Sequence, residues 1–255
     1  MRFALINSGI GLLAAAAELR RLRPDADLVL AMDPDGMPWG PRTPADIADR
    51  SLACAKAAAE SRPDVMIMAC NTGSVHALDA LRAAFEPAVP VVGTVPAIKP
   101  AAAAASTLAI WATEATTASA YQHQLIDRFA NGARVIPVAC PGLADAIDAG
   151  DQAAASAAVA AAASRTPPEC QAVVLGCTEY ELAADLISAA VPGAALFSSA
   201  AAVAAQALRR APAEPAPATG ADRGSVSVLL SGRAADLPPA ALRYPAGRFL
   251  AQPAA

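Results

Sequence analysis

The sequence predicts an α/β protein with parallel sheets flanked by helices, arranged in two lobes. Three observations support this fold class. Short aliphatic runs alternate with helical stretches along the chain, which is the pattern of a parallel sheet covered by helices. Two of these runs, 65–69 and 172–176, each stop at a cysteine that is followed by small polar residues and a helix. The length of 255 residues allows a large core, in one domain or in two.

The first lobe is expected to contain residues 1–95 and 211–255. Thr43 and Pro44 mark a clear helix start, with threonine as N-cap and proline at the first helical position. A loop rich in proline and glycine, residues 33–41, has too many turn formers for regular structure. The elements expected in this lobe are strands at 3–6, 28–32, 65–69, 89–93 and 226–230, and helices at 14–22, 43–62 and 75–85.

The second lobe is expected to contain residues 96–210, starting at a proline-flanked segment followed by an alanine run. A polar turn at 113–119 and a Pro/Ala-rich linker at 212–224 interrupt the pattern, and the tail after the linker is expected to return to the first lobe. The elements expected in the second lobe are strands at 107–112, 135–138 and 172–175, and helices at 120–129, 143–149, 152–163 and 182–190.

Composition excludes several classes of function. A formal net charge of −4 with scattered arginines argues against nucleic acid as a partner, and no apolar stretch is long enough to cross a bilayer. An odd number of cysteines without a Cys-x-x-Cys pair favours a soluble protein of the reducing cytoplasm over a disulfide framework or a zinc site. The two histidines exclude a histidine-rich metal site. A homodimer is compatible with the sequence, although no apolar stripe marks an interface.

The chemistry is expected at Cys70 and Cys177, because both thiols follow the carboxyl end of a buried strand. Ligands bind at this edge of a parallel sheet, and the next helix can stabilise a thiolate there. Two thiols, one charged and one protonated, suit removal and return of a proton at one carbon. Pyridoxal phosphate is disfavoured because Lys56 and Lys99 are the only lysines and Lys56 lies in a helix pattern. The sequence therefore predicts a site without cofactor or metal.

Several motifs, in this order, resemble those of the glutamate racemases within the wider aspartate/glutamate racemase superfamily. The resemblance covers roughly residues 1–200 and rests on the segments 7–11, 38–41, 69–72, 92–99, 113–121, 140–141 and 175–178. It implies two pseudo-symmetric lobes with the active site at their interface, and Cys70 and Cys177 as the bases that interconvert L- and D-glutamate without cofactor. It further implies that D-glutamate is supplied to peptidoglycan. By the same resemblance, the substrate is contacted by Asn7, Ser8, Trp39, Gly40, Asn71, Thr72, Thr116, Thr178 and Glu179.

Three departures from the family pattern concern the groups around the thiols. Asn7 stands where aspartate is usual, Glu179 where glutamate racemases usually have histidine, and Trp39 where tyrosine is usual. Relative to the family pattern, this chain thus lacks the carboxylate beside Cys70 and has one beside Cys177 instead. An ionised Glu179 disfavours a thiolate at Cys177. We therefore expect Cys70 to be the thiolate at rest and the two directions to have unequal rates.

The sequence leaves three alternatives to a glutamate racemase. Glu179 after Cys177-Thr178 is common in aspartate racemases and broad-specificity relatives, so aspartate or several acidic amino acids are alternative substrates. Other superfamily members use the same cysteine pair for decarboxylation or isomerisation of a dicarboxylate. The changes at Asn7 and Glu179 also allow a catalytically weakened pseudoenzyme that binds an acidic amino acid or a regulatory partner. Retention of both cysteines and their polar neighbours argues against the pseudoenzyme.

Overall fold

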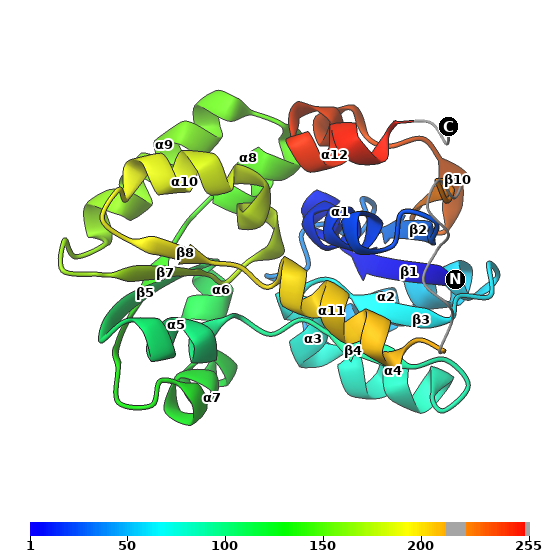
Figure 1. Cartoon of the computed structure of the whole chain (residues 1–255), viewed down its shortest axis with the longest axis horizontal. Coiled ribbons are helices and arrows are strands. Elements are labelled where there is room, and N and C mark those ends of the chain that lie inside the picture. The colour runs from blue at the N-terminus through cyan, green and yellow to red at the C-terminus, as the bar shows by residue number, and fades with distance from the viewer. Residues whose placement is uncertain (213–222, 253–255) are drawn as a thin grey trace. The chain divides into compact units, whose positions relative to one another are not determined.

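The computed structural model describes residues 1–212 and 223–252. The chain divides into two compact units, Met1–Thr94 with Ala200–Ala255, and Val95–Ser199 (Figure 1). Each unit is a mostly parallel sheet flanked by helices, which confirms the predicted fold class. One boundary differs from the expected one: residues 200–210 form helix α11 (Ala200–Arg210), which packs against α1 (Leu13–Leu22) of the first unit. Most of the expected linker, residues 213–222, lies outside the described residues.

The first unit contains a six-stranded sheet in the order β10-β9-β2-β1-β3-β4. All neighbours are parallel except β10 and β9. The register aligns the carboxyl ends of β1, β2, β3 and β9, so the residues that follow these strands share one edge of the sheet. The strands are β1 (Arg2–Asn7), β2 (Asp27–Met32), β3 (Val65–Met68), β4 (Val91–Gly93), β9 (Val226–Leu230) and β10 (Arg233–Ala235).

Helices cover both faces of this sheet. Helix α2 (Pro44–Ala59) packs on β1 and β2, whereas α11 contacts β3, β4 and α1, and α1 contacts α12 (Pro245–Leu250). The remaining helical elements are η1 (Ile10–Leu12), α3 (Asn71–His76), α4 (Leu78–Phe85) and η3 (Pro239–Arg243). The helix expected at 75–85 therefore begins earlier and is divided at Ala77. The early start was missed because the residue that caps α3 is Cys70, which is not a usual N-cap residue.

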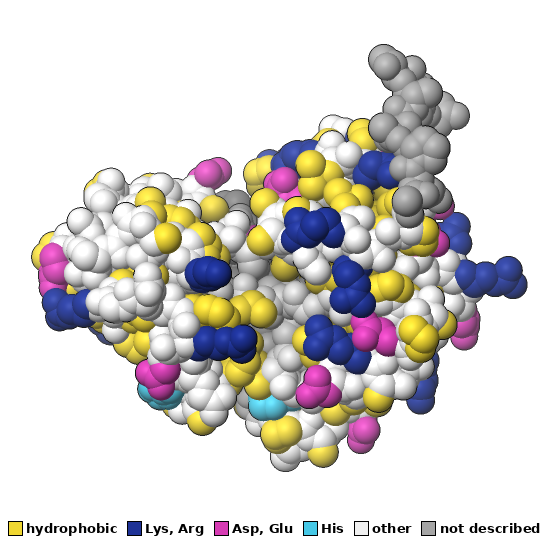
Figure 2. All heavy atoms as spheres, turned by 60° about the horizontal axis from the view of Figure 1, so that its bottom comes forward, with side chains coloured by type: hydrophobic (Ala, Val, Ile, Leu, Met, Phe, Trp, Pro, Cys, Tyr) yellow, Lys and Arg dark blue, Asp and Glu magenta, His cyan; other side chains and the backbone are white. Residues whose placement is uncertain are grey.

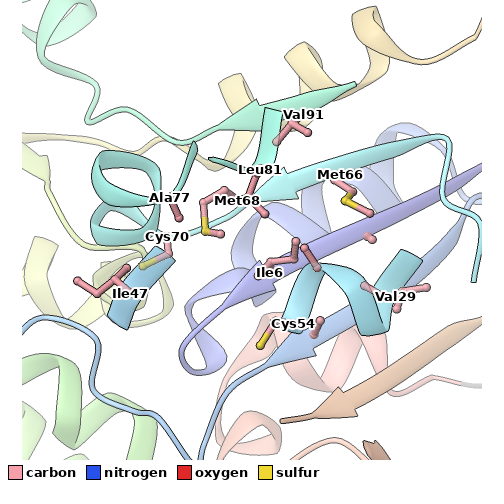
Figure 3. Close-up of a cluster of buried hydrophobic side chains, with 14 of the residues drawn as sticks. Ile6, Val29, Ile47, Cys54, Met66, Met68, Cys70, Ala77, Leu81 and Val91 are labelled. Atoms are coloured by element: carbon pink, nitrogen blue, oxygen red, sulfur yellow. The ribbon is translucent and has the colours of Figure 1, made fainter. Parts of the chain in front are cut away.

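The core of the first unit depends on strand alternation. Ala4 and Ile6 on β1 belong to a buried cluster with Ala55 and Ala58 of α2, while the intervening strand residues face the opposite side. Small alanine side chains let α2 lie close to the sheet. Figure 3 shows this cluster, with Cys70 at the end where β3 stops. The apolar packing of the first unit thus continues up to the thiol.

The second unit contains a four-stranded, all-parallel sheet in the order β6-β5-β7-β8. Helices α5 and α7 form one buried cluster with β5 and β7. The sequence analysis did not predict β8, helix α5, the short helix α6 in the expected polar turn, or the 3-10 helix η2 after Cys177. The elements are β5 (Thr107–Ala112), β6 (Arg134–Ala139), β7 (Ala172–Leu175), β8 (Ala195–Phe197), α5 (Ile98–Ala104), α6 (Glu114–Thr117), α7 (Ala120–Phe129), α8 (Leu143–Ala149), α9 (Gln152–Arg165), η2 (Thr178–Ala183) and α10 (Ala184–Ala190).

Two surface properties bear on partners. Among the described residues, no helix combines the length and the apolar character needed to cross a membrane. On the face shown in Figure 2, Lys and Arg side chains are interspersed with acidic and uncharged side chains.

Stability of the first unit should depend on the buried face of α4. Leu81 is fully buried in the cluster that contains Cys70, whereas Leu22 at the end of α1 is half exposed. Replacing Leu81 with alanine should lower the free energy of unfolding by about 2–5 kcal/mol, because it leaves a cavity. The same substitution at Leu22 should cost less than about 0.5 kcal/mol. Urea titration of both variants measures the difference, and equal losses would contradict this packing.

Candidate active site

Asn7 joins the carboxyl ends of β1 and β3 in the first unit. Its side-chain Nδ2 donates to the carbonyl oxygen of Ala69 at 2.7 Å, and its Oδ1 accepts from the backbone N–H of Ser8 at 2.7 Å. The side chain is fully buried, so both ends of the amide need such partners. A carboxylate at position 7 would place an oxygen against the Ala69 carbonyl oxygen. Asparagine therefore fits this bonding pattern, and it holds the peptide immediately before Cys70.

Cys70 is the N-cap of α3, in an extended backbone conformation. Its sulfur accepts a hydrogen bond from the backbone N–H of Gly73 at 3.4 Å, and its side chain is 6% exposed. A hydrogen bond donated to sulfur is stronger when the sulfur is charged, so this geometry favours a thiolate over a thiol. The surroundings of Cys70 therefore suit a proton acceptor.

The other predicted substrate contacts of the first unit lie in segments that follow strands β1, β2 and β3. Asn71 and Thr72 begin α3, and Ser8 follows β1; Asn71 and Ser8 are buried and Thr72 is half-buried. The space over the Cα of Gly40 is open. Trp39 is only 1% exposed and belongs to the buried cluster that contains Cys70. Its Nε1 donates to Asp33 Oδ2 at 3.0 Å.

Asp33 is a buried acidic residue that the sequence reasoning missed. It follows β2 at the same edge of the sheet, and it accepts from Arg50 Nη1 at 3.2 Å and from Ser231 Oγ at 3.1 Å. The Asp33 carboxylate, by this hydrogen bond, raises the pKa of Arg50 above its ordinary value. The signal for Asp33 was its position directly after a strand.

Cys177 has a different partner in the second unit. It follows Gly176 at the carboxyl end of β7 and precedes η2. Its sulfur lies 2.8 Å from Glu179 Oε2, and the Thr178 hydroxyl lies 3.4 Å from the same oxygen. Glu179 is 4% exposed. Sulfur and carboxylate can bond to each other only if one proton lies between them, so the thiol donates to the carboxylate in this arrangement.

Tyr180 and Thr116 complete the surroundings in the second unit. Tyr180 is fully buried, and its hydroxyl donates to the carbonyl oxygen of Cys140 at 3.4 Å. Burial raises the pKa of Tyr180 well above its ordinary value, and the acidic groups of Cys177 and Glu179 add to the shift. Thr116 is half-buried on α6, which follows β5, and its hydroxyl lies 3.0 Å from that of Thr113.

The remaining cysteines are packing residues. Burial raises the pKa of the Cys54 and Cys140 thiols to about 12, which makes both poor nucleophiles at neutral pH. Cys170 is buried in the loop before β7, and burial also raises the pKa of its thiol. Cys70 and Cys177 differ from these three cysteines in position, because each precedes a helix at the carboxyl end of a strand.

The predicted site residues form two sets, one at the carboxyl edge of each sheet. The first set comprises Asn7, Ser8, Trp39, Gly40, Cys70, Asn71 and Thr72, and the second comprises Thr116, Cys177, Thr178 and Glu179. Each set contains one thiol, polar side chains and backbone N–H groups at the start of a helix. Among the described residues, no group of three or more His, Cys, Asp or Glu side chains is placed to hold a metal ion.

Comparison with known proteins agrees with these features. Residues 7–207 match the profile of the Asp/Glu/Hydantoin racemase family. The glutamate racemase of Pseudomonas putida is 37% identical over 212 residues, which cover 81% of this chain and 79% of that protein. The glutamate racemase of Herpetosiphon aurantiacus is 35% identical over 234 residues, which cover 89% of this chain and 91% of that protein.

Solved structures show the same fold. The crystal structure of Escherichia coli glutamate racemase in complex with L-glutamate and the activator UDP-MurNAc-ala aligns with a TM-score of 0.79 and 29% identity, covering 95% of this chain and 91% of that chain. Glutamate racemase from Campylobacter jejuni aligns with a TM-score of 0.76 and 21% identity, over 98% of both chains, and supports the fold alone. The resemblance found in the sequence is confirmed: this chain belongs to the Asp/Glu/Hydantoin racemase family.

Proposed function

We propose that this racemase interconverts L- and D-glutamate without a cofactor, with Cys70 and Cys177 as its two bases. The observation that carries the proposal is the contrast between the two sulfurs. Cys70 accepts a hydrogen bond from a backbone N–H, whereas Cys177 donates one to a carboxylate. A two-base reaction needs one thiolate and one thiol at the start of a turnover. The two hydrogen bonds favour these two states.

The reaction follows from the two protonation states. The Cys70 thiolate removes the α-proton of one enantiomer, and the electron pair of the broken C–H bond moves into the substrate carboxylate, which becomes enediolate-like. The Cys177 thiol then gives its proton to the opposite face of the α-carbon. Polar groups at Ser8, Asn71 and Thr72 can bind the charged groups of the substrate and stabilise this intermediate. Each turnover inverts the carbon and exchanges the states of the two sulfurs.

Glu179 makes the two directions unequal. When Cys177 has lost its proton, its thiolate lies beside the Glu179 carboxylate, and the like charges disfavour this state. The two enantiomers have equal free energy, so kcat/KM must be the same in both directions. The asymmetry therefore belongs to kcat and KM individually. We propose that turnover is limited by the return of the free enzyme to its starting protonation state, so both constants should be lower in the direction that must regenerate the rarer enzyme form.

Glutamate is the first choice of substrate, because the relatives are glutamate racemases and that of Escherichia coli is crystallised with L-glutamate. In this function the enzyme is cytoplasmic and supplies D-glutamate for peptidoglycan; free cysteines suit a reducing compartment. Glu179 favours aspartate or a broad range of acidic amino acids as the second candidate. Comparing kcat/KM for D-glutamate and D-aspartate by polarimetry decides between them.

The roles of the two cysteines can be separated by proton exchange in deuterium oxide. Racemisation should fall at least about a thousandfold in both Cys70→Ser and Cys177→Ser, because each variant lacks one base. Each variant should still exchange the α-proton of one enantiomer, because the remaining thiol can remove and return a proton on its own side. Cys177→Ser should exchange the enantiomer that Cys70 deprotonates, and Cys70→Ser should exchange the other.

Nuclear magnetic resonance of each enantiomer measures this exchange, and Cys54→Ser is the control because Cys54 is a buried thiol outside the site. Exchange of both enantiomers by one single variant would contradict the assignment. Absence of exchange in every variant and in the wild type would instead support the pseudoenzyme.

The charge of Glu179 can be removed without losing an acceptor for Cys177. In Glu179→Gln, the thiolate of Cys177 is no longer opposed by a neighbouring carboxylate. The kcat of the direction that starts from this thiolate should rise by about tenfold relative to the other, which corresponds to one pKa unit. Initial rates from each enantiomer measure the ratio of the two kcat values. Glu114→Gln is the control, because Glu114 is exposed on α6; a ratio unchanged in Glu179→Gln would refute the role of the charge.

A further inference from the structure

Asp33 is a buried carboxylate that the proposed reaction does not use. Its side chain is 95% buried, and its three hydrogen-bond partners come from different segments of the first unit. They are the indole N–H of Trp39 in the loop after β2, Arg50 on α2, and Ser231 in the turn between β9 and β10. Arg50 balances the charge of Asp33, and Ser231 holds its second oxygen. Arg50 and Ser231 thus fix the orientation of the carboxylate that accepts the hydrogen bond of Trp39.

Trp39 connects this carboxylate to the helix that Cys70 caps. The space above the Cα of Gly73 is filled by Trp39 and Met68: a methyl group built there would lie 3.1 Å from Trp39 Cζ3 and would overlap the Met68 sulfur. The indole therefore packs directly on Gly73, and position 73 has no room for a residue with a side chain. Gly73 is also the residue whose N–H donates to the Cys70 sulfur.

We propose that Asp33 is a positioning residue for Cys70, acting through Trp39 and Gly73. The charge-assisted bond from the indole to Asp33 fixes the plane of the ring, and the ring holds the peptide N–H of Gly73 toward the sulfur. The proposal rests on the proposed function in one respect, namely that Cys70 is a base. The proposal also changes the role of Trp39, which the sequence predicts to contact the substrate. The only polar hydrogen of its side chain is directed to Asp33, so Trp39 supports the thiol instead of donating to the substrate.

The structural link can be observed directly, because the chain contains two tryptophans. In ¹⁵N-labelled protein, the indole N–H signals of Trp39 and Trp111 are assigned by loss of one signal in Trp39→Phe. Trp111 is an internal reference, since its Nε1 donates to Thr166 Oγ1 in the second unit at 2.8 Å. The Trp39 signal should shift in Asp33→Asn, while the Trp111 signal should stay in place.

The functional link is tested by a double-mutant cycle. Asp33→Asn and Trp39→Phe should each lower kcat by about tenfold with KM little changed, and each should slow the alkylation of Cys70 at neutral pH. The double variant should be no slower than the slower single variant, because both act through one contact. Asp35→Asn is the matched control: Asp35 is an exposed carboxylate two residues away, paired with Arg233, and its loss should leave kcat and the indole signals unchanged.

Two results would overturn the proposal. The first is an additive loss of kcat in the double variant. The second is an Asp33→Asn protein that loses stability in urea but keeps its kcat and its rate of Cys70 alkylation, which would make Asp33 structural only. If the wild type racemises no acidic amino acid, the proposed function fails, but the indole signal and the Cys70 alkylation rate still decide whether Asp33 acts on Cys70. Mass spectrometry of the Cys70 peptide gives that rate, with unreactive Cys54 as reference.

Discussion

Parallel strand pairing is the constraint on which the placement of both thiols depends. Parallel neighbours end at the same edge of a sheet, so short polar segments that are distant in sequence become neighbours there. In the first unit the aligned ends of β1, β2, β3 and β9 bring together Asn7, Asp33, Cys70 and Ser231. Asn7 then bonds to Ala69, and Ser231 to Asp33, across the strand ends. The chemistry of Cys70 is therefore a property of the sheet edge and cannot be assigned to the cysteine alone.

The two thiols occupy similar positions in the fold but differ in electrostatic surroundings. Cys70 caps its helix and accepts from Gly73, whereas Cys177 makes no capping bond and donates to Glu179. Asn7 cannot take a proton from Cys70, because an amide is neutral and both of its ends are engaged. Of these two thiols, Cys177 is thus the one that is hydrogen-bonded to a carboxylate in the described structure. Asn7 and Glu179 therefore give the two thiols different surroundings.

Much of the fold could be predicted because its elements have clear local signals. The helix 120–129 and the strands 107–112 and 226–230 have the predicted bounds, since caps and turn residues flank them. The start of α3 was missed because its cap is a cysteine. Residues 200–210 were expected in the second lobe without a predicted helix, because their packing partner α1 is distant in sequence. Asp33 directly follows a strand, which is a local signal, but its partner Ser231 could not be predicted because the two residues are 198 positions apart. Local sequence patterns predicted the positions of Cys70 and Cys177 at strand ends, whereas contacts between residues distant in sequence determine the surroundings of Cys70.

The position of β9 has a consequence for how the chain folds during synthesis. The first unit needs β9 beside β2, and α11 and α12 against α1, so its sheet and one of its helical layers are completed only by segments that are synthesised after the second unit. The second unit is continuous from Val95 to Ser199 and has all its strands available earlier. Domains commonly fold in the order of their synthesis. Here the first unit must wait for its second segment, and the unit inserted within it can fold first.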